Sequence, residues 1–144
     1  MYLNESDSFS DLLHRVYDAS ASYIHDHLLE LNLNEQQARL LKYVGDHPGT
    51  LQKDLANYLN RQSATVTNML KTMEQRGYLE REIPEDNERQ KRIFLLPKGE
   101  KIVAQVATIF AGLEEQIESA VPVRQRALFI EQIKQIAAAI NGEE

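Results

Sequence analysis

Two short apolar patterns between Thr50 and Gly77 constrain the fold of this chain more than any other feature. The apolar residues recur at helical spacing, as Leu51, Leu55 and Leu59 in the first pattern and as Val66, Leu70 and Met73 in the second. We expect Thr50 to cap the first helix, Ser63 to cap the second, and Gly77 to end the second in a left-handed conformation. Two such helices joined by about three or four polar residues form a helix-turn-helix.

The segment that follows has the pattern of a charged β-ribbon. Residues 78–83 and 92–96 alternate in polarity or run apolar, as strands do, whereas residues 84–91 between them are polar and charged. We expect two strands joined by an exposed turn, which is the wing of a winged helix-turn-helix. The predicted fold is therefore mainly α with a small β wing, in which a winged helix-turn-helix domain is flanked by long N- and C-terminal helices.

The second helix of this motif has a polar face that suits DNA. At 100° per residue, the side opposite Val66 carries Ala64, Asn68, Lys71 and Gln75, with threonines at its edges. Amide, hydroxyl and small side chains fit the edges of base pairs in the major groove. The alternative is an ordinary solvated face. The candidate DNA-contacting residues of this helix are Ser63, Ala64, Thr65, Thr67, Asn68 and Lys71.

The predicted wing carries a second group of candidates. Arg89, Lys91 and Arg92 lie beside its turn. A guanidinium fits a narrow minor groove, where the negative potential is strongest, and a nearby carboxylate can hold it in one rotamer. Asp86 and Glu88 are the candidate supports for the wing arginine. The alternative is a mixed-charge loop that is merely soluble.

One pattern runs through residues 51–99, and it consists of Leu55-Ala56, Ser63, Val66-Thr67, the run from Leu70 to Arg81, Arg89, Ile93, Leu95 and Gly99. With this pattern, the segment resembles the DNA-binding domain of the MarR (multiple antibiotic resistance regulator) family of bacterial transcriptional regulators. Two positions depart from the family pattern: Asn87 stands where the family commonly has Asp, and Leu96 stands where Thr commonly caps the next helix. The resemblance implies a homodimer whose terminal helices interlock, and a small aromatic or lipophilic effector that changes the affinity for DNA.

The flanking segments have the apolar stripes of long helices. Such stripes cover residues 8–31, 102–121 and 128–140, and Asn34 with Gln37 resembles a capping box that starts a further helix through about Asp46. Long apolar faces beside a small DNA-binding module need a partner to cover them. We therefore predict a dimerisation region over 1–33 and 98–144 and a winged helix-turn-helix domain over 34–97. The alternative is a self-contained helical cap within a monomer.

Charge and composition narrow the classes of function. The net charge is −6, but residues 51–101 contain 10 basic and 8 acidic side chains, whereas the rest of the chain contains 6 and 14. The acidic groups are thus concentrated away from the predicted DNA-binding segment. The absence of cysteine excludes thiol redox sensing, disulfides and cysteine-ligated zinc. His25 and His27 would point about 200° apart on a helix, so they cannot chelate one ion, and we predict neither metal nor cofactor.

Together these patterns predict a DNA-binding transcriptional regulator and not an enzyme. We expect a homodimeric, sequence-specific repressor that binds double-stranded DNA at a pseudo-palindromic operator. A winged helix that docks another protein without binding DNA is the alternative. No basic leader precedes an apolar run near the start of the sequence, and no stretch approaches about 18 apolar residues, so we expect a cytoplasmic location.

Overall fold

The computed structural model describes residues 7–83 and 90–143. The chain forms two compact units, one ending at Phe110 and the other beginning at Ala111. The predicted strand-turn-strand segment falls partly outside the described residues, because 84–89 are not among them. None of the helices in the described part is long and apolar enough to span a membrane.

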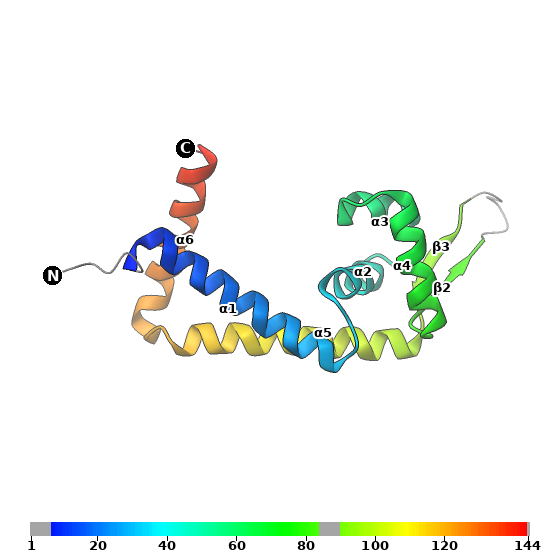
Figure 1. The fold of residues 1–144 in the computed structure, drawn as a ribbon, viewed down its shortest axis with the longest axis horizontal. Coiled ribbons are helices and arrows are strands. Elements are labelled where there is room, and N and C mark those ends of the chain that lie inside the picture. The colour runs from blue at the N-terminus through cyan, green and yellow to red at the C-terminus, as the bar shows by residue number, and fades with distance from the viewer. Residues whose placement is uncertain (1–6, 84–89, 144) are drawn as a thin grey trace. The chain divides into compact units, whose positions relative to one another are not determined.

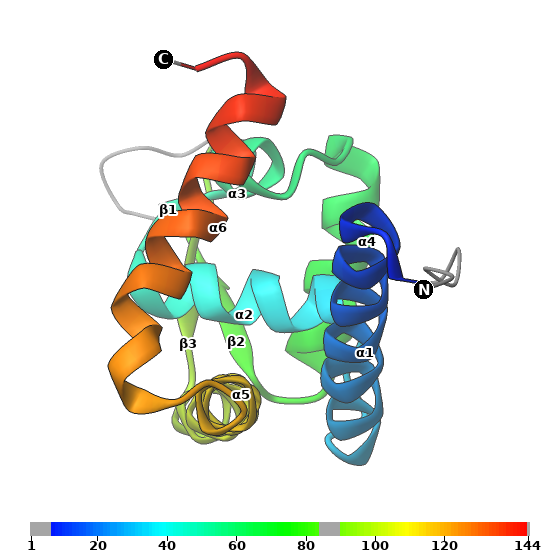
Figure 2. The ribbon, with the colours of Figure 1, turned by 90° about the vertical axis from the view of Figure 1, so that its left-hand side faces the viewer.

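The first unit contains most of the regular structure, in an order that matches the predicted winged helix-turn-helix (Figure 1). Helix α2 lies across the middle of this unit, and α1, α3 and β3 pack against it (Figure 2). Its elements are α1 (Phe9–Glu30), α2 (Glu35–Asp46), β1 (Thr50–Leu51), α3 (Gln52–Leu59), α4 (Ser63–Gln75), β2 (Leu79–Glu82), β3 (Arg92–Leu95) and the start of α5 (Pro97–Ser119).

The sheet has three antiparallel strands in the order β1-β3-β2, one strand more than the sequence predicted. The additional strand is β1, in which Thr50 lies opposite Ile93. The prediction that Thr50 caps the next helix is therefore wrong: Leu51 is the residue that precedes α3, and it makes no side-chain capping bond. Pairing with β3, 43 residues further along, fixes the backbone of Thr50 in an extended conformation.

Local signals at the ends of two other helices are confirmed. Asn34 accepts a hydrogen bond from the Gln37 amide at 2.8 Å, and the Gln37 side chain accepts one from the Asn34 amide at 3.1 Å, which completes the predicted capping box. Helix α2 ends at Asp46, as predicted. Gly77 follows α4 with φ +78°, the left-handed conformation that glycine adopts without strain.

The core of the first unit joins six of its elements. The largest fully buried side chains come from α1, α2, α3, α4, β2 and β3, and they are Leu28, Leu40, Leu41, Val44, Leu55, Val66, Leu70, Met73, Leu79 and Ile93. Three of them, Val66, Leu70 and Met73, form the predicted apolar face of α4. This packing fixes which side of α4 faces solvent.

A close backbone contact joins the start of α5 to the sheet. The carbonyl oxygen of Tyr78 accepts a hydrogen bond from the Leu96 amide at 2.9 Å, and the same oxygen lies against Gly99. A Cβ atom at Gly99 would overlap that oxygen. The glycine in the family-like motif is therefore explained by the approach of two backbones.

The second unit contains the end of α5, a short 3-10 turn at Val123–Gln125 and helix α6 (Arg126–Asn141). Arg126 fixes the turn, because its Nε donates a hydrogen bond to the Val121 carbonyl oxygen at 3.0 Å. No residue of α6 is buried. Its large apolar side chains, including Leu128, Phe129, Ile133, Ile136 and Ile140, are at least 40% exposed.

Candidate nucleic-acid interface

Helix α4 presents one exposed face that is rich in small and polar side chains. Ala64, Thr65, Asn68, Lys71 and Gln75 are all exposed, opposite the fully buried Val66, Leu70 and Met73. Among the 13 residues of the helix, charge is limited to Lys71 and Glu74. A helix with this face suits the major groove, because amide and hydroxyl groups can exchange hydrogen bonds with base edges. We call the exposed face formed by Ala64, Thr65, Asn68, Lys71 and Gln75 the recognition face.

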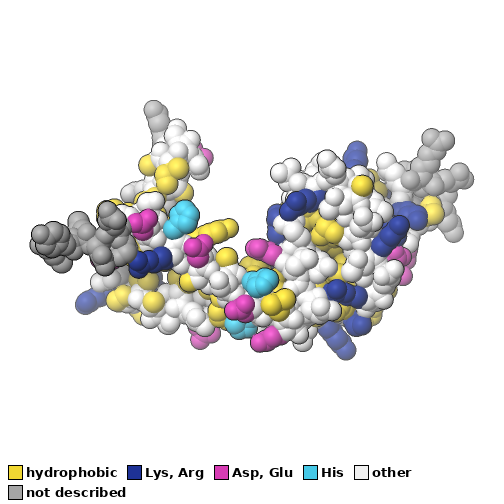
Figure 3. Space-filling model, viewed as in Figure 1, with side chains coloured by type: hydrophobic (Ala, Val, Ile, Leu, Met, Phe, Trp, Pro, Cys, Tyr) yellow, Lys and Arg dark blue, Asp and Glu magenta, His cyan; other side chains and the backbone are white. Residues whose placement is uncertain are grey.

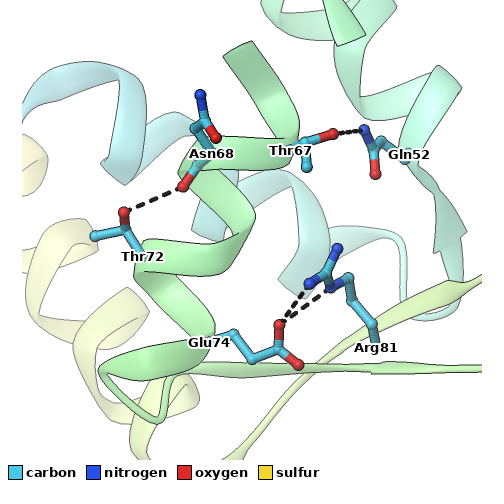
Figure 4. Close-up of polar contacts among 6 residues, drawn as sticks. All are labelled: Gln52, Thr67, Asn68, Thr72, Glu74 and Arg81. Carbon is cyan, nitrogen blue, oxygen red and sulfur yellow. Dashed lines mark hydrogen bonds and ion pairs between the residues drawn. The ribbon is translucent and has the colours of Figure 1, made fainter. Parts of the chain in front are cut away.

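Thr67 differs from the other candidates on this helix. It is half-buried, and its hydroxyl donates a hydrogen bond to the Ser63 carbonyl oxygen at 3.0 Å. The Thr67 hydroxyl oxygen in turn accepts a hydrogen bond from Nε2 of Gln52 on α3 at 2.7 Å (Figure 4). By contrast, no hydrogen bond is formed by the exposed side chain of Asn68 among the described residues, although its backbone carbonyl accepts one from Thr72 at 3.1 Å.

The start of α4 is held from outside the helix. The sequence predicted that Ser63 caps it, but Ser63 is its first residue, and Gln62 precedes it without a side-chain capping bond. The predicted cap is therefore wrong. Instead, Nε2 of Gln52 lies 3.2 Å from both the carbonyl oxygen and the hydroxyl of Ser63, which share one of its two N–H groups while the other binds Thr67.

The end of α4 is joined to the sheet by an ion pair that the sequence analysis did not identify. Arg81 on β2 donates from Nε at 3.1 Å and from Nη2 at 2.8 Å to the same carboxylate oxygen of Glu74 (Figure 4). The Arg81 side chain is only 15% exposed and that of Glu74 is 40% exposed. Two charge-assisted bonds to a partly shielded arginine orient the wing strand relative to the recognition helix.

Further bonds hold the same helix end from other segments. Arg76, which follows α4, donates from Nη1 to the carbonyl oxygen of Asn32 between α1 and α2. Lys98 at the start of α5 donates to the Arg76 carbonyl oxygen at 2.8 Å. Bonds from the α1–α2 connection, the sheet and α5 therefore converge at the end of α4.

The predicted wing residues are only partly described. Arg89 and both candidate supports, Asp86 and Glu88, lie outside the described residues. Lys91 is exposed immediately before β3. Arg92 is the first residue of β3, and its Nη1 donates to the Gly49 carbonyl oxygen at 3.1 Å, so part of its guanidinium anchors the base of the wing.

A basic hollow of about 370 Å³ lies between the start of α3 and the base of the wing. Lys53 and Lys91 supply its positive charge, and Arg81 lines it while paired with Glu74. Gln52 and Gln90 are among its other lining residues. Lysine and arginine side chains are gathered over the helix-turn-helix end of the first unit (Figure 3). The sequence analysis missed Lys53, although its position at the start of the first helix of the motif was a usable signal.

Two carboxylates share one face of β2. The side chains of Glu80 and Glu82 lie two residues apart on the strand. The hydrogen bond to Glu82, followed by partial burial and the negative charge of Glu82, raises the pKa of Glu80. Between the two carboxylates the strand carries Arg81, and Glu82 lies opposite Arg92 on β3.

Comparison with known proteins agrees with this geometry. The MarR family model matches residues 33–91. The transcriptional regulator HosA of Escherichia coli O157:H7 is 27% identical over 105 residues, which cover 73% of this chain and 78% of HosA. A structure from Clostridium acetobutylicum that has been assigned to the MarR family is 32% identical, with a TM-score of 0.80 and coverage of 91% of this chain and 97% of that one.

The same fold occurs in the regulator MepR of Staphylococcus aureus. Its crystal structure gives a TM-score of 0.84 at 22% identity and covers 92% of this chain and 98% of MepR. A MepR–DNA complex gives a TM-score of 0.70, and MepR with ethidium bromide gives 0.72, both at 22% identity. At this identity the likeness concerns the fold alone.

Proposed function

Because this chain belongs to the MarR family of DNA-binding transcriptional regulators, a non-enzymatic family, we propose that it acts as a sequence-specific repressor on a pseudo-palindromic operator. The recognition face of α4 carries the proposal. Ala64, Thr65 and Asn68 are exposed on it, with Lys71 beside them, while the opposite side of the helix is fully buried. Ser63 adds a contact at the start of the helix, and Asn68 pairs with a base edge in the major groove.

The wing extends this contact along the duplex. Lys91 and Arg92, with Arg89, approach the backbone and the adjacent minor groove, and Asp86 or Glu88 supports the arginine. The basic hollow lined by Lys53 and Lys91 supports this part of the proposal, because phosphate contacts supply most of the affinity of such proteins.

The protein acts as a homodimer in this proposal. Residues 34–97 bind DNA, and residues 1–33 and 98–144 form the dimerisation region. Large apolar side chains on both parts support this division: Phe9 is 88% exposed on α1, and Leu128 is 61% exposed on α6. A hollow of about 230 Å³ between the end of α5 and α6 is lined by Ile117, Phe129 and Ile133, among others. Exposed apolar faces of this extent are typical of oligomer interfaces.

Operator affinity is modulated by a small aromatic or lipophilic effector in this proposal. MepR, a relative with the same fold, has been crystallised with ethidium bromide. An effector lowers operator affinity if it binds more tightly to a dimer whose two recognition helices are wrongly spaced for the operator.

Selection of bound fragments from random genomic DNA tests the function. We expect a motif with twofold symmetry whose half-site centres lie about one helical turn, roughly 10 base pairs, apart. Log affinity should fall linearly with log salt concentration, while the preference for the motif over bulk DNA is retained. If the protein recovers no motif and does not bind duplex DNA even at low salt, the proposed function is contradicted. That outcome favours the alternative, a winged helix that docks another protein.

A further inference from the structure

The side-chain amide of Gln52 forms the direct polar link between α3 and the first turns of α4. Its Nε2 lies 2.7 Å from the Thr67 hydroxyl, 3.2 Å from the Ser63 hydroxyl and 3.2 Å from the Ser63 carbonyl oxygen. These three acceptors belong to two consecutive turns of α4. One residue of α3 thus reaches both turns that present the exposed Ala64, Thr65 and Asn68.

The hydrogen-bond donors and acceptors fix the orientation of this amide. The Ser63 carbonyl oxygen can only accept, and it already accepts the Thr67 hydroxyl proton at 3.0 Å. The Thr67 oxygen then has only lone pairs to offer to α3. If an oxygen atom stood in place of the Gln52 nitrogen, it would face two acceptors, the Ser63 carbonyl oxygen and the Thr67 oxygen, and could bond to neither. Only the NH₂ group therefore fits this position.

This network engages the hydroxyl of Thr67 inside the protein. The hydroxyl donates once and accepts once from protein partners, which leaves it poorly placed to read a base. Asn68 is the next residue along the helix and is exposed. Its position relative to a base edge depends on the rotation and height of these turns, and base-reading groups need placement to about 0.5 Å.

We propose that Gln52 is a positioning residue for base recognition. Acting through Thr67 and Ser63, it holds the first turns of α4 against α3 and makes no base contact of its own. Thr67 then acts as its relay and not as a reader. This inference rests on the proposed function, because it requires that α4 reads bases.

A double-mutant cycle on DNA affinity tests the relay. The full-length wild type first selects its motif from random duplexes, and affinities are then measured for that duplex and for bulk genomic DNA. Gln52→Met keeps the length of the side chain but removes the donor, and Thr67→Val keeps the shape but removes the hydroxyl. We expect each variant to lose about fivefold to tenfold in affinity for each half-site of the motif, the equivalent of one hydrogen bond per subunit. The double variant should lose no more affinity for the motif than the weaker-binding single variant does. Affinity for bulk DNA should fall less than affinity for the motif in every case.

Thr72→Val is the matched control. The Thr72 hydroxyl donates the same kind of bond, to the Asn68 carbonyl oxygen four residues earlier at 3.1 Å, and this bond does not involve α3. The effects of Gln52→Met and Thr72→Val should therefore multiply. The thermal unfolding midpoint of each variant is also measured, and binding is measured well below it. A loss of DNA affinity then reflects the position of α4 and not a loss of the folded state.

Several outcomes would overturn the proposal. Multiplying losses for Gln52→Met and Thr67→Val would mean that the two side chains act independently. Equal losses on the motif and on bulk DNA would indicate a general contact, and unchanged affinity of Gln52→Met would exclude any role. If the wild type selects no motif, the proposed function itself fails. If the wild type selects a motif and the variants bind it with unchanged affinity, only the role of Gln52 is overturned.

Discussion

At the scale of single residues, the proposed function assigns affinity to the wing and specificity to the recognition face. Lys91 is exposed next to β3 and lines the basic hollow, so we expect it to contact phosphate. Lys91→Ala should weaken binding to all duplexes similarly and reduce the slope of log affinity against log salt by about 1. Lys42→Ala on α2, which removes an exposed lysine paired with Asp46, is the control and should leave the slope unchanged. A loss confined to one DNA sequence would contradict a phosphate role for Lys91.

Glu80 gives a residue-level prediction about pH. Because its pKa is raised in the folded protein, the stability that it contributes is present below its ordinary pKa and is lost as the pH rises through the raised pKa. Glu80→Gln mimics the protonated acid, so it should increase the free energy of unfolding at pH 7 and leave it unchanged well below pH 4. Urea unfolding at both pH values measures this difference. Because the interaction between Glu80 and Glu82 is mutual, Glu82→Gln should give a similar gain in unfolding free energy at pH 7. If the double variant gained the sum of the two single gains, the two carboxylates would not be coupled.

At the scale of elements, local sequence signals were sufficient wherever local bonds determine the structure. The capping box at Asn34 and the left-handed Gly77 both arise from neighbouring residues, and both were predicted. Strand β1 was missed because its two residues become a strand only by pairing with β3. The Gln52 network was missed for the same reason, since its partners lie 11 and 15 residues away across a turn.

The junction between the sheet and α5 provides a prediction at this scale. Gly99→Ala places a methyl group on the Tyr78 carbonyl oxygen, and because backbone cannot yield as a side chain does, we expect a loss of about 1–3 kcal/mol in unfolding free energy. Gly45→Ala is the matched control. Its Cβ would meet the Leu95 Cδ1 methyl at 3.1 Å, a flexible group, and alanine is favoured over glycine in a helix by about 1 kcal/mol. Equal effects of the two substitutions would contradict this explanation of Gly99.

At the scale of the whole molecule, the exposed apolar residues on α1 and α6 require a partner surface, and a second copy is the one we propose. Leu128→Glu on α6 should weaken self-association at least about tenfold, because burial of a leucine is worth about 1.5–3 kcal/mol. Analytical ultracentrifugation of the wild type should show twice the 16.5 kDa chain mass. Gln135→Glu adds the same charge at an exposed polar position of the same helix and should retain the dimer. A wild type that sediments as single copies would exclude the dimer.

The periodicity of the sequence predicted which face of α4 is buried, and the structure confirms this face through Val66, Leu70 and Met73. Periodicity could not identify which exposed residues are engaged by other elements. Thr67 and Asn68 are adjacent and both polar, yet one is bonded to α3 and the other is exposed. That difference arises from the packing of α3 against α4, which a single helical pattern does not contain.

One experiment tests most directly whether the recognition face of α4 reads bases. The wild type and Asn68→Ala each select bound duplexes from the same random pool. The wild type should recover a twofold-symmetric motif. The variant should keep the spacing of the half-sites but lose base preference at one position in each, at a cost of about 1–3 kcal/mol per half-site. Recovery of the same motif with the same preference by both proteins would contradict the assignment of Asn68, and recovery of none by the wild type would contradict the account of α4 as a DNA-reading helix.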